Sequence, residues 1–213
     1  MTDAELDHTL GVARLREADA VELVATAPVR DALLTGPRLG PLLGPYTALV
    51  WRELDTAWLP LGPELDVSAV PVAAKRPRYA AGTGDDDPRW VVALVLREPA
   101  TGKSLLYAPA LAAWPDAFHE AAVAADCVIV DGTFWDEDEP VRTGISTRTA
   151  SGMGHLPVDG PTGTARRLAG LRARCLYTHL NNTNPLTDPD DDRHKQLADR
   201  GLEVAADGMV IEL

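Results

Sequence analysis

Runs of β-branched and aliphatic residues alternate with runs of helical spacing along most of this chain. Strands are predicted at residues 21–26, 49–54, 65–72, 91–96, 104–107, 126–130 and 174–178, where apolar or β-favouring side chains dominate. Helices are predicted at residues 9–18, 27–34, 115–124 and 161–171, and the acidic run at 188–192 is typical of the start of another. The alternation of strand and helix indicates an α/β protein.

Glycine and proline separate these elements. Gly102 predicts a hairpin between the strands 91–96 and 104–107, and Asp207-Gly208 predicts a second hairpin between 202–205 and 209–213. Segments dense in Gly or Pro predict loops or turns at 36–45, 60–63 and 75–90. We find no internal repeat and no linker long enough to split the chain, so a single domain over residues 1–213 is predicted.

Composition and charge narrow the class of partner. The 213 residues are 46% hydrophobic, enough for one sizeable core, and 32 acidic side chains against 20 Lys and Arg give a net charge of −12. Such a surface repels phosphate backbones and anionic lipid, so nucleic acid and membranes are poor partners. The acidic runs at 85–87 and 136–139 are predicted to be solvated. No apolar stretch has the length of a membrane helix, and the first residues do not resemble a signal peptide.

Both cysteines lie inside apolar runs. Cys127 precedes Val-Ile-Val and Cys175 precedes Leu-Tyr, which is typical of small core residues rather than of a disulfide or a metal clip. We therefore expect a reducing, cytoplasmic setting.

The segment from Thr178 to Pro185, which reads Thr-His-Leu-Asn-Asn-Thr-Asn-Pro, is the first candidate for function. One His with three Asn and a Pro is unfavourable inside a helix or a strand. The predicted strand before it places His179 at a strand end, where α/β proteins carry functional residues. Asn181, Asn182 and Thr183 are then candidates for substrate contact. The alternative is an ordinary turn, in which the Asn side chains bond their own backbone and His179 is merely exposed.

Further His and Asp residues stand at the ends of predicted elements. Asp7 and His8 precede the first helix, Asp131 follows a predicted strand, and His155 lies in a Gly-His-Leu segment. Two imidazoles and a carboxylate on one face suit non-haem iron(II), and zinc hydrolysis fits the same ligands less specifically. The structural alternatives are acids that cap a helix and a histidine that is packed or capping.

Six motifs, spread over the whole chain, carry a family resemblance. They are Thr2-Asp-Ala-Glu-Leu-Asp-His8, Tyr107-Ala-Pro-Ala-Leu111, Val130-Asp-Gly-Thr-Phe-Trp135, Met153-Gly-His-Leu156, Thr178-His-Leu-Asn-Asn-Thr-Asn-Pro185, and the terminal Ala206-Asp-Gly-Met209 with Ile211-Glu-Leu213. With these motifs the chain resembles the pyrroloquinoline quinone (PQQ) biosynthesis protein B family, a branch of the metallo-β-lactamase fold. The resemblance implies an αββα sandwich, with the site in loops at one edge of the paired sheets.

The resemblance also implies a metal site. Metallo-β-lactamase relatives carry the frame His-x-His-x-Asp-His, which is Asp3-Ala-Glu5-Leu-Asp7-His8 in this chain. Because the first two histidines are replaced by carboxylates, the resemblance implies a single metal ion rather than two zinc ions. Its implied ligands are Asp7, His8 and, from the distant loop, His179.

The remaining site residues and the activity also follow from the resemblance. Asp85 and Asp131 are the candidates for a further ligand, and His155 is implied to lie near the substrate as an acid or base. The implied activity is iron-dependent hydroxylation of the tyrosine-derived part of a Glu-Tyr precursor of PQQ, with Fe(II) as cofactor and zinc as the alternative. The other hypotheses are a carrier of PQQ or its precursor toward the periplasm, a zinc-dependent hydrolase, and an inactive shortened homologue.

Members of this family carry a long N-terminal part before the Thr-Asp motif, whereas this chain begins at the motif itself. The strands of that part would complete one sheet, so we expect unpaired sheet edges and exposed apolar faces in this chain. Weak metal binding and a tendency to associate are the predicted consequences, which leaves a homo-oligomer open.

Overall fold

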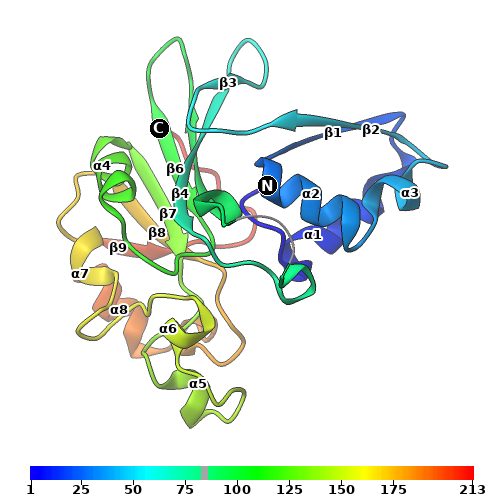
Figure 1. Cartoon of the computed structure of the whole chain (residues 1–213). Helices are drawn as coiled ribbons and strands as arrows, with labels where there is room; N and C mark the ends of the chain where they lie inside the picture. Colours follow the sequence, from blue (N-terminus) through cyan, green and yellow to red (C-terminus); the bar gives the residue numbers. More distant parts are fainter. Residues whose placement is uncertain (83–85) are drawn as a thin grey trace.

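A large mixed sheet is the central element of the structure (Figure 1), a computed structural model that describes residues 1–82 and 86–213. Its seven strands lie in chain order: β3 (Leu59–Pro60), β4 (Asp66–Ala73), β5 (Val91–Arg97), β6 (Ser104–Ala108), β7 (Cys127–Asp131), β8 (Arg174–Thr178) and β9 (Leu202–Val204). Strands β3 to β6 pair antiparallel, whereas β6 to β9 run parallel. A smaller sheet pairs β1 (Ala20–Ala25) in parallel with β2 (Ala48–Glu53).

Helices back each sheet on its outer side (Figure 1). They are α4 (Asp116–Ala124), α7 (Ala165–Leu168) and α8 (Asp192–Ala198) at the large sheet, and α2 (Ala27–Thr35) and α3 (Leu39–Leu43) at the small one. Phe118, Leu168 and Leu197 bury the first group against the large sheet, and Val29 of α2 is buried with residues of β1. Val24 of β1 packs against a cluster of buried residues from β4 and β5, which joins the two sheets. The layers therefore form the predicted αββα sandwich.

The seven strands predicted from 21–26 to 174–178 are confirmed to within one residue at each end. The hairpin of β5 and β6 pairs Leu94 with Tyr107, and Gly102 takes the left-handed conformation in its turn, with φ 75°. Strand β7 is buried on both faces, as expected for a parallel strand with a continuous apolar run. Cys127 and Cys175 are both buried free thiols, as predicted. Among the described residues, no helix has the length and apolar character needed to cross a membrane.

Two element predictions near the N-terminus are only partly confirmed. The helix predicted at 9–18 is a short α1 (Leu6–Thr9) followed by a 3-10 helix at Leu10–Glu17. The predicted loop at 36–45 contains α3, which begins after Arg38 in the left-handed conformation, with φ 56°. Burial of Leu39 and Leu43 stabilises this helix despite its Gly and Pro residues, so tertiary packing overrides local propensity here.

Two predictions near the C-terminus are wrong in extent or in kind. The helix predicted at 161–171 is limited to α7, and the chain before it turns so tightly that a Cβ added to Gly163 would come within 3 Å of the Asp159 backbone. The hairpin predicted over 202–213 does not form. Strand β9 pairs in parallel with β8 instead, and Val210 in the following segment is 82% exposed.

The acidic run at 136–139 is not wholly solvated, because Glu139 is fully buried. Its carboxylate accepts hydrogen bonds from the Trp135 backbone N–H (2.6 Å) and the Thr183 hydroxyl (2.7 Å). Glu139 opens α5 (Glu139–Arg142) and ties the loop after β7 to the loop after β8. The prediction missed it because a run of acids gives no sign of which member is turned inward. In the run at 85–87, Asp85 lies outside the described residues, Asp86 is exposed and Asp87 is partly buried and pairs with Arg89.

Candidate metal centre

The functional candidates gather at the carboxyl ends of β7 and β8. These strands are parallel neighbours in which Asp131 pairs with Thr178, so Asp131 and His179 end at the same edge of the sheet. His155 joins them from the segment after α6 (Ala150–Met153), and His8 joins them from α1. The carboxyl edge of a parallel sheet is where α/β proteins commonly bind ligands.

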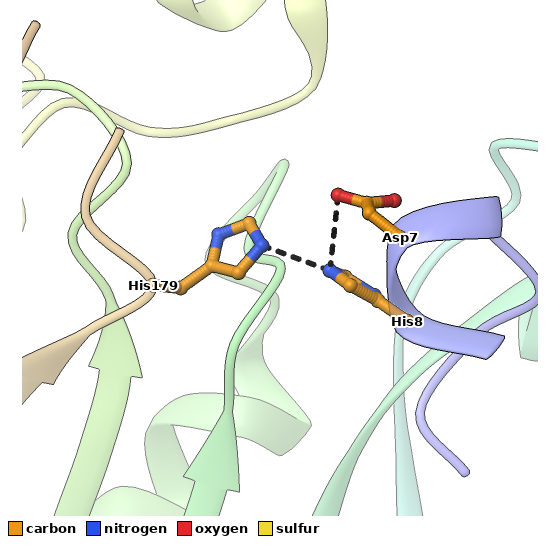
Figure 2. Close-up of side chains that lie close together, drawn as sticks. All are labelled: Asp7, His8 and His179. Atoms are coloured by element: carbon orange, nitrogen blue, oxygen red, sulfur yellow. Dashed lines mark hydrogen bonds and ion pairs between the residues drawn. The ribbon is translucent and has the colours of Figure 1, made fainter. Parts of the chain in front are cut away.

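His8 and His179 face one another across the centre of the site. Figure 2 shows the two rings turned toward each other, with Asp7 beside His8. The two Nε2 atoms are 2.8 Å apart, and an Asp7 carboxylate oxygen lies 3.8 Å from Nε2 of His8. One ligand atom from each of these three residues lies within 4.8 Å of the others. The structure therefore brings the three predicted metal ligands together from opposite ends of the chain.

The partners of the two rings fix their tautomers. Nδ1 of His8 lies 2.8 Å from both carboxylate oxygens of Asp3, so this nitrogen carries a proton and donates it. Nδ1 of His179 donates to the hydroxyl of Thr133 (2.8 Å), which itself donates to Asp131 (2.5 Å). Both Nε2 atoms consequently present lone pairs to each other. Two lone pairs at this distance repel unless a proton or a cation lies between them. A histidine that ligates a metal usually donates its other ring N–H to a hydrogen-bond acceptor, as both rings do here.

A second cluster shares His179 with the first. Asp131 is fully buried and accepts hydrogen bonds from the backbone N–H groups of Leu111 (2.9 Å) and Thr133 (3.0 Å) and from Nδ1 of His155 (2.7 Å). Burial raises the pKa of Asp131, but its interactions with His155, His179 and Thr133 outweigh burial and hold the pKa well below its ordinary value. The ionised carboxylate of Asp131 thus orients the ring of His155 directly and the ring of His179 through the hydroxyl of Thr133.

Asp3 and His8 form a charge-coupled pair. Burial raises the pKa of Asp3, but the hydrogen bonds and charge of His8, together with hydrogen bonds from the Glu5 backbone and Thr2, lower it by more. The pKa of Asp3 therefore lies below its ordinary value. The hydrogen bond to Asp3 raises the pKa of His8 above 6.5, against the opposing effect of burial. A proton therefore competes with a metal ion for His8 more strongly than for an ordinary histidine.

We predict that metal affinity falls as the pH falls through the raised pKa of His8, by about tenfold per pH unit for one displaced proton. Replacing Asp3 with Asn should move this fall to lower pH, because the carboxylate that raises the pKa of His8 is lost. The same variant should bind metal roughly 10–100-fold more weakly at pH 8, as outer-shell substitutions do. Zinc affinity measured by chelator competition from pH 5.5 to 8.5 checks both effects, and identical pH profiles would contradict the pairing.

His179 has a left-handed backbone, with φ 61°. Among the described residues it shares a positive φ with one other non-glycine residue, Arg38. An L residue in this region stores strain of roughly 1–2 kcal/mol, and such strain is typical of functional positions. The conformation turns the chain sharply after β8 and directs the ring toward His8 and Thr133.

The Asn-rich loop after β8 (residues 179–185) is held beside the site by hydrogen bonds. Asn181 donates to Thr183 (2.6 Å), Thr183 donates to Glu139, and the buried Asn184 donates to the Gly132 carbonyl (2.7 Å). Asn182 is exposed, and substrate contact by Asn181, Asn182 and Thr183 stays a prediction.

Other predicted ligands differ in where they lie. Asp7 is 74% exposed but close to His8, and Asp131 belongs to the cluster of His155 and His179 rather than to that of Asp7 and His8. Asp85 lies outside the described residues. The supporting roles of Asp3 and Thr133 were missed. The only sequence signals were a carboxylate five residues before His8 and the Asp-Gly-Thr spacing after β7.

A cavity of about 490 Å³ opens beside the histidines and is lined by Asp7, His8, His155 and His179 among others. A smaller one of about 290 Å³ lies against His8 and His179 near Tyr107. A small molecule can therefore reach the ligand nitrogens, and the donor set of two imidazoles and a carboxylate fits a single divalent metal ion.

Known proteins resemble this chain in sequence and in fold. The model of the β-lactamase superfamily domain matches residues 1–180. Coenzyme PQQ synthesis protein B of Azoarcus sp. (strain BH72) is 39% identical over all of this chain and 72% of its own length, and that of Pseudomonas syringae pv. syringae (strain B728a) is 37% identical with the same coverage. The crystal structure of Zn(2+)-bound PqqB from Methylobacterium extorquens superposes with a TM-score of 0.87 at 27% identity, over all of this chain and 71% of that one. A diphosphatase of the PhnP family shares the fold, with a TM-score of 0.63 at 16% identity over 98% of this chain and 67% of that one.

Proposed function

This chain belongs to the coenzyme PQQ synthesis protein B family, within the β-lactamase superfamily, and from that membership we propose that it acts in PQQ biosynthesis on a small-molecule precursor. The proposed reaction is a metal-dependent oxidative hydroxylation of the tyrosine-derived part of a Glu-Tyr precursor. Fe(II) is the proposed cofactor, held by Asp7, His8 and His179.

The observation that carries this proposal is the pair of Nε2 lone pairs of His8 and His179, 2.8 Å apart beside Asp7 and open to the cavity. Two imidazoles and one carboxylate with free coordination positions suit non-haem iron, which supplies the activation of dioxygen when it is bound. Asp3 and Thr133 keep both rings in the tautomer that a ligand needs. Zinc is the alternative metal, which the zinc-bound relative from Methylobacterium extorquens favours.

His155 is the proposed acid or base. Its Nδ1 donates to the ionised Asp131, so the lone pair of Nε2 is free to accept a proton. The ring lines the same cavity as His8 and His179. A histidine oriented by a buried carboxylate is suited to take the proton of a phenol or of a ring carbon during oxidation.

The proposal is tested by loading the protein with Fe(II) under anaerobic conditions, then adding the Glu-Tyr precursor, ascorbate and dioxygen, and following oxygen uptake and product mass. We expect turnover with Fe(II), and roughly 100-fold slower turnover in His155→Gln at unchanged iron content. The matched control is His119→Gln, an exposed histidine on α4 that does not line the cavity. Precursor binding without oxygen uptake would favour the carrier instead, and full activity of His155→Gln would remove this residue from the chemistry.

A further inference from the structure

The cavity beside the metal ligands is unusually basic for this chain. Lys75, Arg76, Arg78 and Arg148 line it, against three acidic side chains, Asp3, Glu5 and Asp7. The whole protein has 32 acidic and 20 basic residues, so this wall reverses the overall charge balance. A divalent ion at His8 and His179 would make the cavity more positive still. A cavity of this sign inside an acidic protein attracts anions.

Two of these cations have partners within the protein. Arg76 pairs with Asp86 (2.7 Å) and lies over the ring of Trp90. Lys75 donates to the carbonyl of Met153 (2.7 Å) and lies 3.8 Å from Glu5.

Arg78 and Arg148 differ from them. No carboxylate of the described residues lies within 4.0 Å of either guanidinium, and Arg148 makes one long bond of 3.3 Å to the Gly152 carbonyl. Both residues are exposed on the cavity. Their charges are therefore available to a ligand.

The two arginines stand on separate segments that Lys75 links to each other. Arg78 begins the 3-10 helix Arg78–Ala80 after β4, and Arg148 lies just before α6. Lys75 spans the two segments through its bond to Met153, and it packs so closely on Gly154 that an added Cβ would come within 2.9 Å of its side chain. Because Arg78 and Arg148 line the same cavity from two segments, they can contact two groups of one ligand.

We propose that Arg78 and Arg148 bind carboxylates and make the site selective for a substrate that carries at least two of them. The naming of that substrate as a carboxylated precursor of PQQ rests on the proposed function. A guanidinium forms paired, charge-assisted hydrogen bonds with a carboxylate, so two arginines at separate points of one cavity orient a dicarboxylate as well as bind it.

The test uses PQQ, a tricarboxylate, as the probe, with its trimethyl ester as the uncharged counterpart. Binding to the zinc-loaded protein is measured by equilibrium dialysis for wild type, Arg78→Gln, Arg148→Gln, the double variant and Arg148→Lys. We expect each single Gln variant to bind PQQ roughly 10-fold more weakly and the double variant roughly 100-fold, with partial rescue by lysine. Ester binding should not change. Arg172→Gln is the matched control, because it removes an exposed arginine that does not line the cavity.

Wild-type affinity for PQQ in the double variant would overturn the inference, as would the absence of PQQ binding by the wild-type protein. Tighter binding of inorganic pyrophosphate than of PQQ would overturn the choice of carboxylate over phosphate. Oxygen uptake with Fe(II) separates the two proposals. If PQQ binding depends on the arginines but no turnover occurs, the carboxylate site is supported and the proposed hydroxylation is wrong. If turnover occurs but PQQ binding is the same in all variants, the hydroxylation is supported and the carboxylate site is wrong.

Discussion

Replacing His179 with alanine is expected to abolish stable metal binding, with the affinity for Fe(II) or Zn(II) lowered more than about 100-fold. Loss of an outer-shell partner alone costs roughly 10–100-fold, and this variant removes a ligand nitrogen itself. Of the ligand set found among the described residues, His8 and the exposed carboxylate of Asp7 would remain at that position. Metal content after dialysis and affinity by chelator competition measure the effect. His119→Ala, on the exposed side of α4, should bind metal like the wild type.

The variant His179→Gly distinguishes the loss of the ligand nitrogen from the effect of backbone strain at this position. Because φ of His179 is 61°, glycine should occupy the position without strain, whereas alanine retains the strain. We expect both variants to lose the metal, and the glycine variant to unfold with a free energy about 1 kcal/mol higher than the alanine variant. Stoichiometric metal in either variant would show that the Nε2 pair is not the binding site.

The fold was largely predictable from sequence because its strands are short apolar runs with clear ends. The buried run of β7 and the Gly102 hairpin specify their structures locally. What could not be predicted depends on partners distant in the sequence. Strand β9 pairs with β8 rather than with the residues that follow it, and burial of Leu39 and Leu43 in the core beside the small sheet keeps α3 helical in a Gly- and Pro-rich segment.

The metal ligands were predictable where a motif placed them next to a turn. The residues that hydrogen-bond to those ligands and orient them were less predictable. His8 and His179 are 171 positions apart, and the family resemblance rather than any spacing paired them. Glu139 belongs to an acidic run that was predicted to be solvated, yet its buried carboxylate accepts a hydrogen bond from Thr183 in the loop after β8. Thr133 is one of many threonines in the sequence, and only the packing at the ends of β7 and β8 places its hydroxyl between Asp131 and two histidines.

Replacing Asp131 with alanine is expected to lower the free energy of unfolding by about 3–5 kcal/mol, the cost of removing one partner from a buried charged network. The backbone N–H groups of Leu111 and Thr133 and Nδ1 of His155 would all lose the acceptor that the fully buried Asp131 provides. Urea unfolding of the metal-free proteins measures this difference without the contribution of a bound ion. Asp190→Ala, on the exposed segment before α8, should change stability by less than about 0.5 kcal/mol.

The same carboxylate sets a pH dependence that an Asn variant should remove. The folded pKa of Asp131 lies below its unfolded value, so its contribution to stability is fully present above the ordinary pKa of 3.8 and is lost as the pH falls toward the folded value. Asp131→Asn keeps the size of the side chain but cannot be ionised, so its stability should fall less steeply between pH 4 and pH 2 than that of the wild type, roughly in line with the loss of one titrating group. Parallel curves for the two proteins would mean that Asp131 does not carry the buried charge that orients His155 and His179, and the proposed roles of both histidines would lose their structural support.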